Sequence, residues 1–180
     1  VREVAAANGL DRMAPVMVEI STAPDGALYA LPIGLETQNL MFYAPEVFAA
    51  AGVELPATWE EFLASAPKIQ EAGFIPIAVG AQGWQLGILL TAATLGTGGV
   101  DLYRRVVMDH DAEAAGGPEM VRVFQLMRDL SAFSDPGASN RAWNDSLNLV
   151  AEGRAAMQVM GSWAGAELDN MGLAQGTQWD

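Results

Sequence analysis

The tryptophan at position 163 is the residue best placed to bind another molecule. The stretch Ala155–Val159 reads as a largely buried strand, and a glycine turn follows it. Gly161 allows close backbone approach and Ser162 can cap a following helix, so Trp163 is expected in the first turn of that helix. Open α/β sheets place ligand groups at the carboxyl ends of their strands. The pattern is typical of a binding site, and a core tryptophan at a helix start is the alternative.

Catalytic chemistry has little support in the sequence. The chain has no cysteine and one histidine, His110, which lies between two aspartates in an expected exposed loop. A metal there would need further ligands that no spacing supplies, so we expect no metal and no cofactor. Glu60 and Glu61 fall in the first turn of an expected helix, where the helix dipole explains them better than a glycosidase acid and base. The only lysine, Lys68, belongs to no phosphate-binding loop.

Two sets of motifs form a recognisable pattern. The first is Gly153-Arg154-Ala155-Ala156-Met157 followed by Gly161-Ser162-Trp163. The second runs in order through Gly26–Pro32, Asn39–Tyr43, Glu46–Phe48, Gly52 and Pro56–Phe62. In order and spacing they resemble the extracellular solute-binding proteins that feed sugars to ABC importers, a class that includes maltose-binding and glucose-binding proteins.

The resemblance implies an α/β, periplasmic-binding-protein-like fold in which two lobes enclose a sugar. A sugar site needs aromatic rings to stack on the apolar face of the sugar, and amides or carboxylates to pair with its hydroxyls. The resemblance places Trp163 on the stacking tryptophan of the family. Trp143 occupies a position where similar proteins put an aromatic residue in the cleft, and its neighbour Asp145 can reach a hydroxyl. Packing against the core is the alternative for Trp143.

Four further positions complete the expected substrate-binding site. Glu36 and Asn39 follow the crossing strand of the family; maltose binders carry a carboxylate at the position of Glu36 and several glucose binders do not, so the sugar is not specified. Gln82 and Trp84 follow an expected strand, in a loop where similar proteins carry acidic or aromatic ligand groups. The alternative for Glu36 is a solvated carboxylate. For Asn39 it is strand-edge capping, and for Trp84 it is packing at a helix start. Trp59, by contrast, is assigned to packing.

Length and composition indicate a piece of such a protein. The 180 residues are 51% hydrophobic and include five tryptophans, which predicts a folded core, yet they are too few for two lobes. We expect residues 1–32 to be the end of the first lobe with the crossing segment, and 33–180 to be an incomplete second lobe. The last stretch, Gln175–Asp180, is expected to lack a closing element. A net charge of −13 argues against nucleic acid as a partner.

The expected elements alternate between short strands and helices, which favours the α/β class. The strands are Ala27–Ile33, Phe74–Val79 and Ala155–Val159, with Pro76 tolerated only at an edge or at a strand start. Three helices are expected in the first half: one ended by Asn8-Gly9, one from Pro45 to Gly52, and one capped by Thr58 with a kink or boundary at Pro67. A fourth, Trp84–Leu95, is expected to be ended by Gly96–Gly99. The last two are a helix that starts at Pro118, with Met120, Val121, Phe124, Met127 and Leu130 at helical spacing, and a helix that is capped by Ser139 or Asn140 and runs through Trp143 to Ala151.

The resemblance implies capture of a mono- or oligosaccharide in an inter-lobe cleft, followed by delivery to the permease subunits of an ABC transporter. The implied location is periplasmic or extracellular, with a lipid anchor as one attachment to the cell surface. The expected core helix is too short to cross a membrane, so the chain itself is not expected to span one. A carbohydrate-active enzyme or a lectin-like sugar-binding module is the alternative.

Overall fold

The computed structural model describes residues 2–9, 15–30, 34 and 36–180, and the chain forms two compact units, Val1–Glu36 and Thr37–Asp180. The first unit contains α1 (Arg2–Ala7) and α3 (Pro15–Ile20). Helix α1 ends as predicted, because Gly9 adopts a positive φ of 69° just beyond it. The assignment of residues 1–32 to a first lobe stays a prediction.

The strand expected at Ala27–Ile33 is wrong over its described part. Residues 27–30 make one isolated bridge, between Leu28 and Thr22, and no ladder. The reason is local: the Asp25 carboxylate accepts a hydrogen bond from the Ala27 N–H (2.8 Å) and folds the chain into a tight turn. Residues 31–33 lie outside the described residues.

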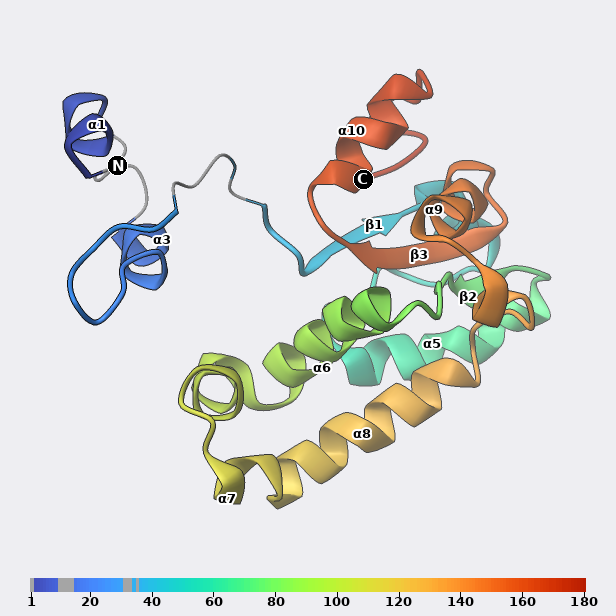
Figure 1. Cartoon of the computed structure of the whole chain (residues 1–180). Helices are drawn as coiled ribbons and strands as arrows, with labels where there is room; N and C mark the ends of the chain where they lie inside the picture. The colour runs from blue at the N-terminus through green and yellow to red at the C-terminus, as the bar shows by residue number, and fades with distance from the viewer. Residues whose placement is uncertain (1, 10–14, 31–33, 35) are drawn as a thin grey trace. The chain divides into compact units, whose positions relative to one another are not determined.

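The second unit has the predicted α/β fold, with helices around a three-stranded sheet (Figure 1). Its elements are β1 (Leu40–Tyr43), α4 (Pro45–Ala50), α5 (Trp59–Glu71), β2 (Ile75–Ile77), α6 (Gly83–Tyr103), the π-helix η1 (Arg104–Met108), α7 (Ala112–Ala115), α8 (Pro118–Ser131), the 3₁₀ turn η2 (Ala138–Asn140), α9 (Trp143–Ala151), β3 (Ala155–Met160) and α10 (Trp163–Asn170).

Strand β3 is the centre of the sheet, whose order is β1-β3-β2. All six of its residues are buried, as the sequence predicts for the Ala155 strand. It pairs antiparallel with β1, Leu40 opposite Met160, and parallel with β2. Pro76 lies in β2 and therefore on an edge strand, as expected. Strand β1 is an element that the sequence pattern did not predict.

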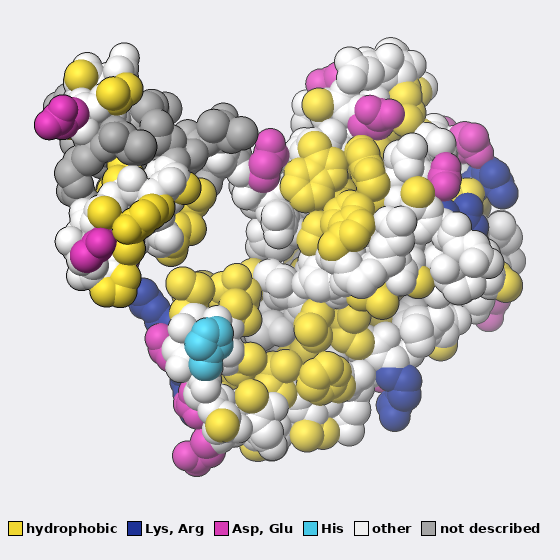
Figure 2. Space-filling model, viewed as in Figure 1, with side chains coloured by type: hydrophobic (Ala, Val, Ile, Leu, Met, Phe, Trp, Pro, Cys, Tyr) yellow, Lys and Arg dark blue, Asp and Glu magenta, His cyan; other side chains and the backbone are white. Residues whose placement is uncertain are grey.

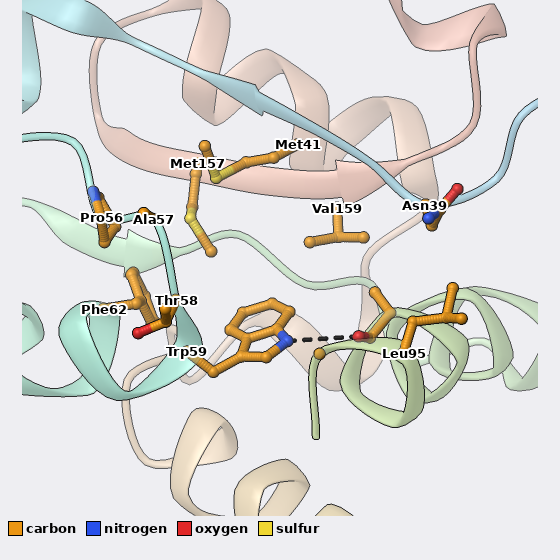
Figure 3. A pocket seen from close by; sticks show the side chains of 12 residues that line it. Asn39, Met41, Pro56, Ala57, Thr58, Trp59, Phe62, Leu95, Met157 and Val159 are labelled. Carbon is orange, nitrogen blue, oxygen red and sulfur yellow. Dashed lines mark hydrogen bonds between the residues drawn. The ribbon is translucent and has the colours of Figure 1, made fainter. Parts of the chain in front are cut away.

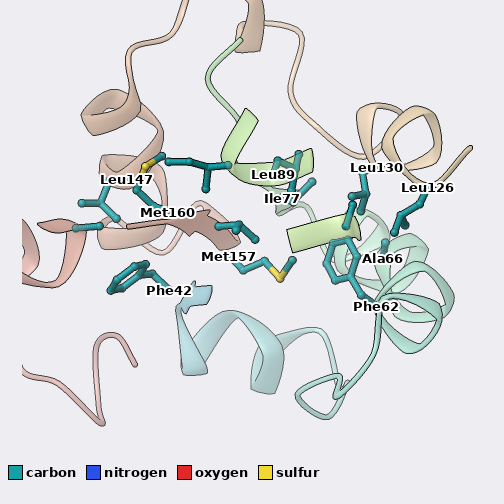
Figure 4. Close-up of a cluster of buried hydrophobic side chains, with 14 of the residues drawn as sticks. Phe42, Phe62, Ala66, Ile77, Leu89, Leu126, Leu130, Leu147, Met157 and Met160 are labelled. Carbon is teal, nitrogen blue, oxygen red and sulfur yellow. The ribbon is translucent and has the colours of Figure 1, made fainter. Parts of the chain in front are cut away.

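Helices cover both faces of the sheet. Figure 1 shows α5, α6 and α8 on one face and α4, α9 and α10 on the other. Side chains from both layers meet the sheet in one large hydrophobic core, in which Met157 of β3 lies among Phe62 of α5 and Ile77 of β2 (Figure 4). Burial of each of these aliphatic and aromatic side chains stabilises the folded state by about 1.5–3 kcal/mol. The core thereby holds the strand ends in place.

Two helices are longer than the sequence pattern predicts. Helix α5 runs through Pro67 without a boundary, since its Thr58 cap, whose side chain accepts from the Glu61 N–H (3.1 Å), and its buried face outweigh the lost hydrogen bond. Helix α6 continues past Leu95, and of the glycines that follow only Gly99 leaves helical geometry (φ 68°, ψ −168°).

The helical segment Gly83–Met108, counted across the break at Gly99, has 26 residues, and within the described chain it is the one segment long and apolar enough to cross a membrane. The helix expected at Trp84–Leu95 therefore runs a few residues further and breaks at Gly99, within the glycine run that was predicted to end it. Ile88, Leu89 and Ala93 of this helix lie in the hydrophobic core. It packs against α8 and β3, as the core helix of the unit.

Helices α8 and α9 differ from expectation at single positions. Val121 and Phe124 are 52% and 57% exposed, because the buried face of α8 runs instead through Met120, Val123, Leu126 and Leu130. Helix α9 begins after Ala142, not after Ser139 or Asn140, which form the preceding 3₁₀ turn.

The end of the chain is packed, contrary to expectation. Asp180 exchanges two backbone hydrogen bonds with Tyr43 of β1 (2.9 and 3.0 Å). The preceding Trp179 is 5% exposed and its ring lies 6.0 Å from that of Phe42. This segment therefore covers the outer edge of β1.

Candidate functional site

The candidate site lies at one edge of the sheet, where β2 and β3 have their carboxyl ends and β1 has its amino end. The parallel pairing of Ile77 with Met157 brings the two following loops to this edge. A hydrogen bond from the Ser162 N–H to the Thr37 carbonyl oxygen (2.8 Å) brings the segment before β1 to the same place. Three segments far apart in the sequence therefore converge here.

Trp163 begins α10 at this edge and is partly buried. Its ring lies over Gly161, where a Cβ atom would stand 2.2 Å from the indole Cζ3. The absence of a side chain at Gly161 therefore allows this ring position, as the sequence predicted for a close approach.

The Trp163 ring has an aromatic neighbour in Trp84. Their ring centroids are 6.3 Å apart with planes tilted by 50°. Trp84 comes from the first turn of α6, just after β2, and remains 45% exposed. The pair joins the loops that follow the two parallel strands and presents aromatic surface to solvent. Figure 2 shows hydrophobic side chains exposed beside α10 on the face turned to the viewer.

Gln82 orients this aromatic pair. Its Oε1 accepts hydrogen bonds from Trp84 Nε1 (3.1 Å) and from Nε2 of the buried Gln85 (2.9 Å). The indole N–H of Trp84 is thereby satisfied within the protein. The amide nitrogen of the exposed Gln82 donates to no protein atom among the described residues, so it can donate to a ligand.

Trp143 and Asp145 lie on α9, on the opposite side of β3 from α6. Trp143 packs partly buried against the core, and its carbonyl oxygen accepts from Gln158 Nε2 (3.0 Å). The Asp145 carboxylate accepts from the Ala142 N–H (3.3 Å) and so helps to begin the helix. These are structural roles, and the assignment of both residues to the sugar site stays a prediction.

Asn39 and Glu36 precede β1. Asn39 is exposed at the edge of a cavity of about 400 Å³ between α5, α6 and the sheet. Glu36 belongs to the first unit, as its last residue, and is exposed. The pairing of Glu36 with the other site residues stays a prediction.

The cavity is lined largely by residues that sequence reasoning assigned to packing (Figure 3). Trp59 lies partly buried in its wall, donates from Nε1 to the Ala92 carbonyl oxygen (3.3 Å) and meets Phe62 edge-on, with ring centroids 6.2 Å apart. A Cβ at Gly96 would stand 2.5 Å from the Trp59 ring. The small residues at 92 and 96, one helical turn apart, were the signal that a ring packs here.

The geometry places an aromatic pair and an amide at the carboxyl ends of two parallel strands in an α/β lobe. The sequence profile of the bacterial extracellular solute-binding proteins matches residues 5–180, and the chain belongs to this family. A probable sugar-binding periplasmic protein of Rhizobium meliloti is 34% identical over 177 residues, 98% of this chain and 42% of the relative. A probable sugar-binding periplasmic protein of Brucella suis is 32% identical over 173 residues, which are 96% of this chain and 41% of that relative.

Solved structures show the same fold. A chitin oligosaccharide binding protein matches with a TM-score of 0.77 and 27% identity over 92% of this chain and 42% of its own. The bacterial solute receptor AcbH, described as preferring β-D-galactopyranose exclusively, matches with a TM-score of 0.68 and 27% identity over 98% and 47%. The chain therefore spans less than half the length of these relatives.

Proposed function

We propose that this chain is the larger part of one lobe of a sugar-binding protein that supplies an ABC importer. In this proposal the sugar is a mono- or oligosaccharide, and the chain works in the periplasm or outside the cell. The two similar solved structures bind a galactopyranose and chitin oligosaccharides by description, and the similar proteins of Rhizobium and Brucella are described as sugar-binding. Permease subunits are the second proposed partner, and no catalytic role is proposed.

The observation that carries the proposal is the Trp84–Trp163 pair. Two rings tilted by 50° present faces in different directions. Such faces suit the apolar C–H surfaces of pyranose rings, and the Gln82 amide beside them suits a hydroxyl. The pair lies at the carboxyl ends of strands, where α/β folds bind ligands. Ring stacking with lateral hydrogen bonding is the chemistry that this arrangement performs.

The other expected residues extend the proposed site outward. Asn39 and Glu36 would approach from the segment before β1, which the Ser162–Thr37 hydrogen bond holds near Trp163 at its Thr37 end. Trp143 and Asp145 are proposed as outer contributors. Residues 1–32 are proposed to belong to the first lobe, which would supply the opposite wall of the cleft.

Calorimetric titration of the full-length protein with β-D-galactopyranose and chitin oligosaccharides tests the proposal. We expect saturable binding of at least one sugar without release of hydrolysed product. Trp163→Ala should weaken that binding while the protein stays folded. Hydrolysis of a chitin oligosaccharide, or equal affinity of the unaltered and Trp163→Ala proteins, would contradict the proposal.

A further inference from the structure

The loop that carries Gln82 and Trp84 rests on a second loop, residues 134–141. The Ala81 N–H donates to the Ala138 carbonyl oxygen over 3.1 Å. One residue earlier, a Cβ atom on Gly80 would stand 2.7 Å from the Arg141 carbonyl oxygen, so the two backbones are in close contact. The position of the Trp84 ring therefore depends on where the 134–141 loop is held.

An ion pair holds that loop. Arg141 Nη2 donates to Asp135 Oδ1 over 2.5 Å, and the same oxygen accepts from the Gly137 N–H over 2.6 Å. The two side chains are only 22% and 12% exposed, for arginine and aspartate respectively. Asp135 Oδ2 and Arg141 Nε are buried without another partner among the described residues. Removal of either side chain therefore leaves a sheltered charge uncompensated.

We propose that Asp135 and Arg141 are a positioning pair for the aromatic site. The pair closes the 134–141 loop, and the loop holds the Ala81 backbone through Ala138. Ala81 directly precedes Gln82, whose side chain orients Trp84 toward Trp163. The consequence for sugar affinity rests on the proposed function, whereas the effect on the two rings is independent of any sugar.

A second ion pair provides a matched control. Arg105 and Asp111 are also six residues apart, with Nη2 and Oδ2 at 2.8 Å. The Asp111 carboxylate accepts from the Glu113 and Ala114 N–H groups at the start of α7. This pair therefore holds a loop in the same manner, but its contacts are with α7 and not with the loop of Trp84.

The coupling between the two indoles reports their geometry directly. Indole rings that are close and tilted produce an exciton couplet in far-ultraviolet circular dichroism, and the difference between unaltered full-length protein and Trp163→Phe isolates the couplet of this pair. The test compares Arg141→Gln, Arg141→Lys and Arg105→Gln by this couplet, by titration with β-D-galactopyranose and chitin oligosaccharides, and by the melting temperature. All couplets are measured well below the melt, so that loss of folding does not enter.

Arg141→Gln should reduce the couplet roughly twofold or more, because the supporting contact that fixes the ring is lost. Arg141→Lys, which keeps the charge, should recover part of it, and Arg105→Gln should leave it unchanged. Affinity for the sugar that binds should fall roughly tenfold in Arg141→Gln. If Arg141→Gln does not fold, the positioning role is judged from Arg141→Lys, whose couplet should then be smaller than that of the unaltered protein.

An unchanged couplet in the folded Arg141 variants, whatever their melting temperature, would overturn the positioning role and leave the pair a purely structural one. A reduced couplet in a protein that binds neither sugar would instead uphold the positioning role while counting against the proposed function. The two failures are therefore distinguishable.

Discussion

The lobe contains two tryptophan-lined regions, and they differ in how each ring is used. At the strand ends, Trp84 and Trp163 pair with each other and present ring surface to solvent. In the cavity of about 400 Å³, Trp59 lies against Gly96 and Phe62. Its N–H is bonded to a backbone carbonyl of α6, whereas the Trp84 N–H is bonded to the exposed side chain of Gln82.

Trp59 therefore stabilises the contact between two helices, whereas Trp84 and Trp163 leave ring surface available to a ligand. Trp59 of α5 contacts α6 through its ring at Gly96 and through its N–H at the Ala92 carbonyl oxygen, so its removal separates two elements of the core. Trp84 instead contacts the Trp163 ring and donates its N–H to Gln82 in its own loop. Cavity size alone is therefore a poor guide to the binding site in this lobe, and the solvent-facing pair is the site that we propose.

The largest expected effect is on stability and comes from Trp59→Ala. A large-to-small change at a core tryptophan typically costs about 3–5 kcal/mol, and for this partly buried ring we expect about 3 kcal/mol. Denaturant unfolding of the full-length protein measures it. Sugar affinity should stay within about twofold, a change of ~0.4 kcal/mol. Lost affinity with unchanged stability would reverse the assignment of the two regions.

Trp163→Ala should have the complementary effect. We expect sugar binding to weaken by about 1–3 kcal/mol, because stacking and buried ring area are lost, with a smaller change in the free energy of unfolding. Calorimetry and thermal melts separate the two quantities. Trp84→Ala serves as the partner variant, and the double variant should lose less than the sum of the single losses if the rings act together.

Two glycine substitutions sharpen the comparison. Gly96→Ala forces a Cβ into the Trp59 ring and Gly161→Ala forces one into the Trp163 ring. Overpacking at each site costs about 1–3 kcal/mol. We expect Gly96→Ala to lower the free energy of unfolding and Gly161→Ala chiefly to weaken sugar binding. The same two measurements check both. Equal effects on affinity would show that the cavity also contributes to binding.

The smallest expected effect concerns pH. Among the described residues, no ionisable side chain lines the cavity. Near the other end of β1, partial burial and then the Asp180 carboxylate raise the pKa of the Tyr43 phenol above its usual 10.0. The neutral phenol is the form that the folded state favours. Its contribution is therefore complete below the unfolded pKa and is lost as pH rises through the higher folded pKa.

Spectrophotometric titration of tyrosine checks this, and Asp180→Asn should move the Tyr43 pKa back toward its usual value. Sugar affinity should not follow that titration, since Tyr43 is remote from the indole pair along β1. An affinity that falls with ionisation of Tyr43 would link the two ends of the strand.

The sequence predicts the central parts of this lobe well, because their signals are local. The apolar run from Ala155, its glycine turn and the Thr58 cap each depend on neighbouring residues, and each is found where expected. Strand β1 was missed since its four residues are defined by pairing with β3, far along the chain. The helix boundary expected as one alternative at Pro67 was wrong because tertiary packing of α5 outweighs the lost helical hydrogen bond.

The places of Trp163 and Trp84 after their strands were predictable from the sequence, but their contact as a pair was not. Trp163 and Trp84 each follow a strand, which is visible in the sequence, whereas their ring contact depends on the parallel pairing of β2 with β3. The cavity beside Trp59 depends likewise on packing. The helical role of Asp145 is local, because its carboxylate accepts from the Ala142 N–H three residues earlier. The 134–141 loop was not singled out, since an aspartate and an arginine six residues apart have no local signature.

The ring of Trp163 over Gly161 has a thermodynamic consequence. A side chain that is free in solution loses rotational entropy when a ligand immobilises it, at a cost of about 0.5–1.5 kcal/mol. The bare backbone at Gly161 and the Trp84 ring already confine Trp163 from two sides. Most of that entropy is therefore lost when the chain folds, so a molecule that stacks on this ring meets a surface already in its bound orientation.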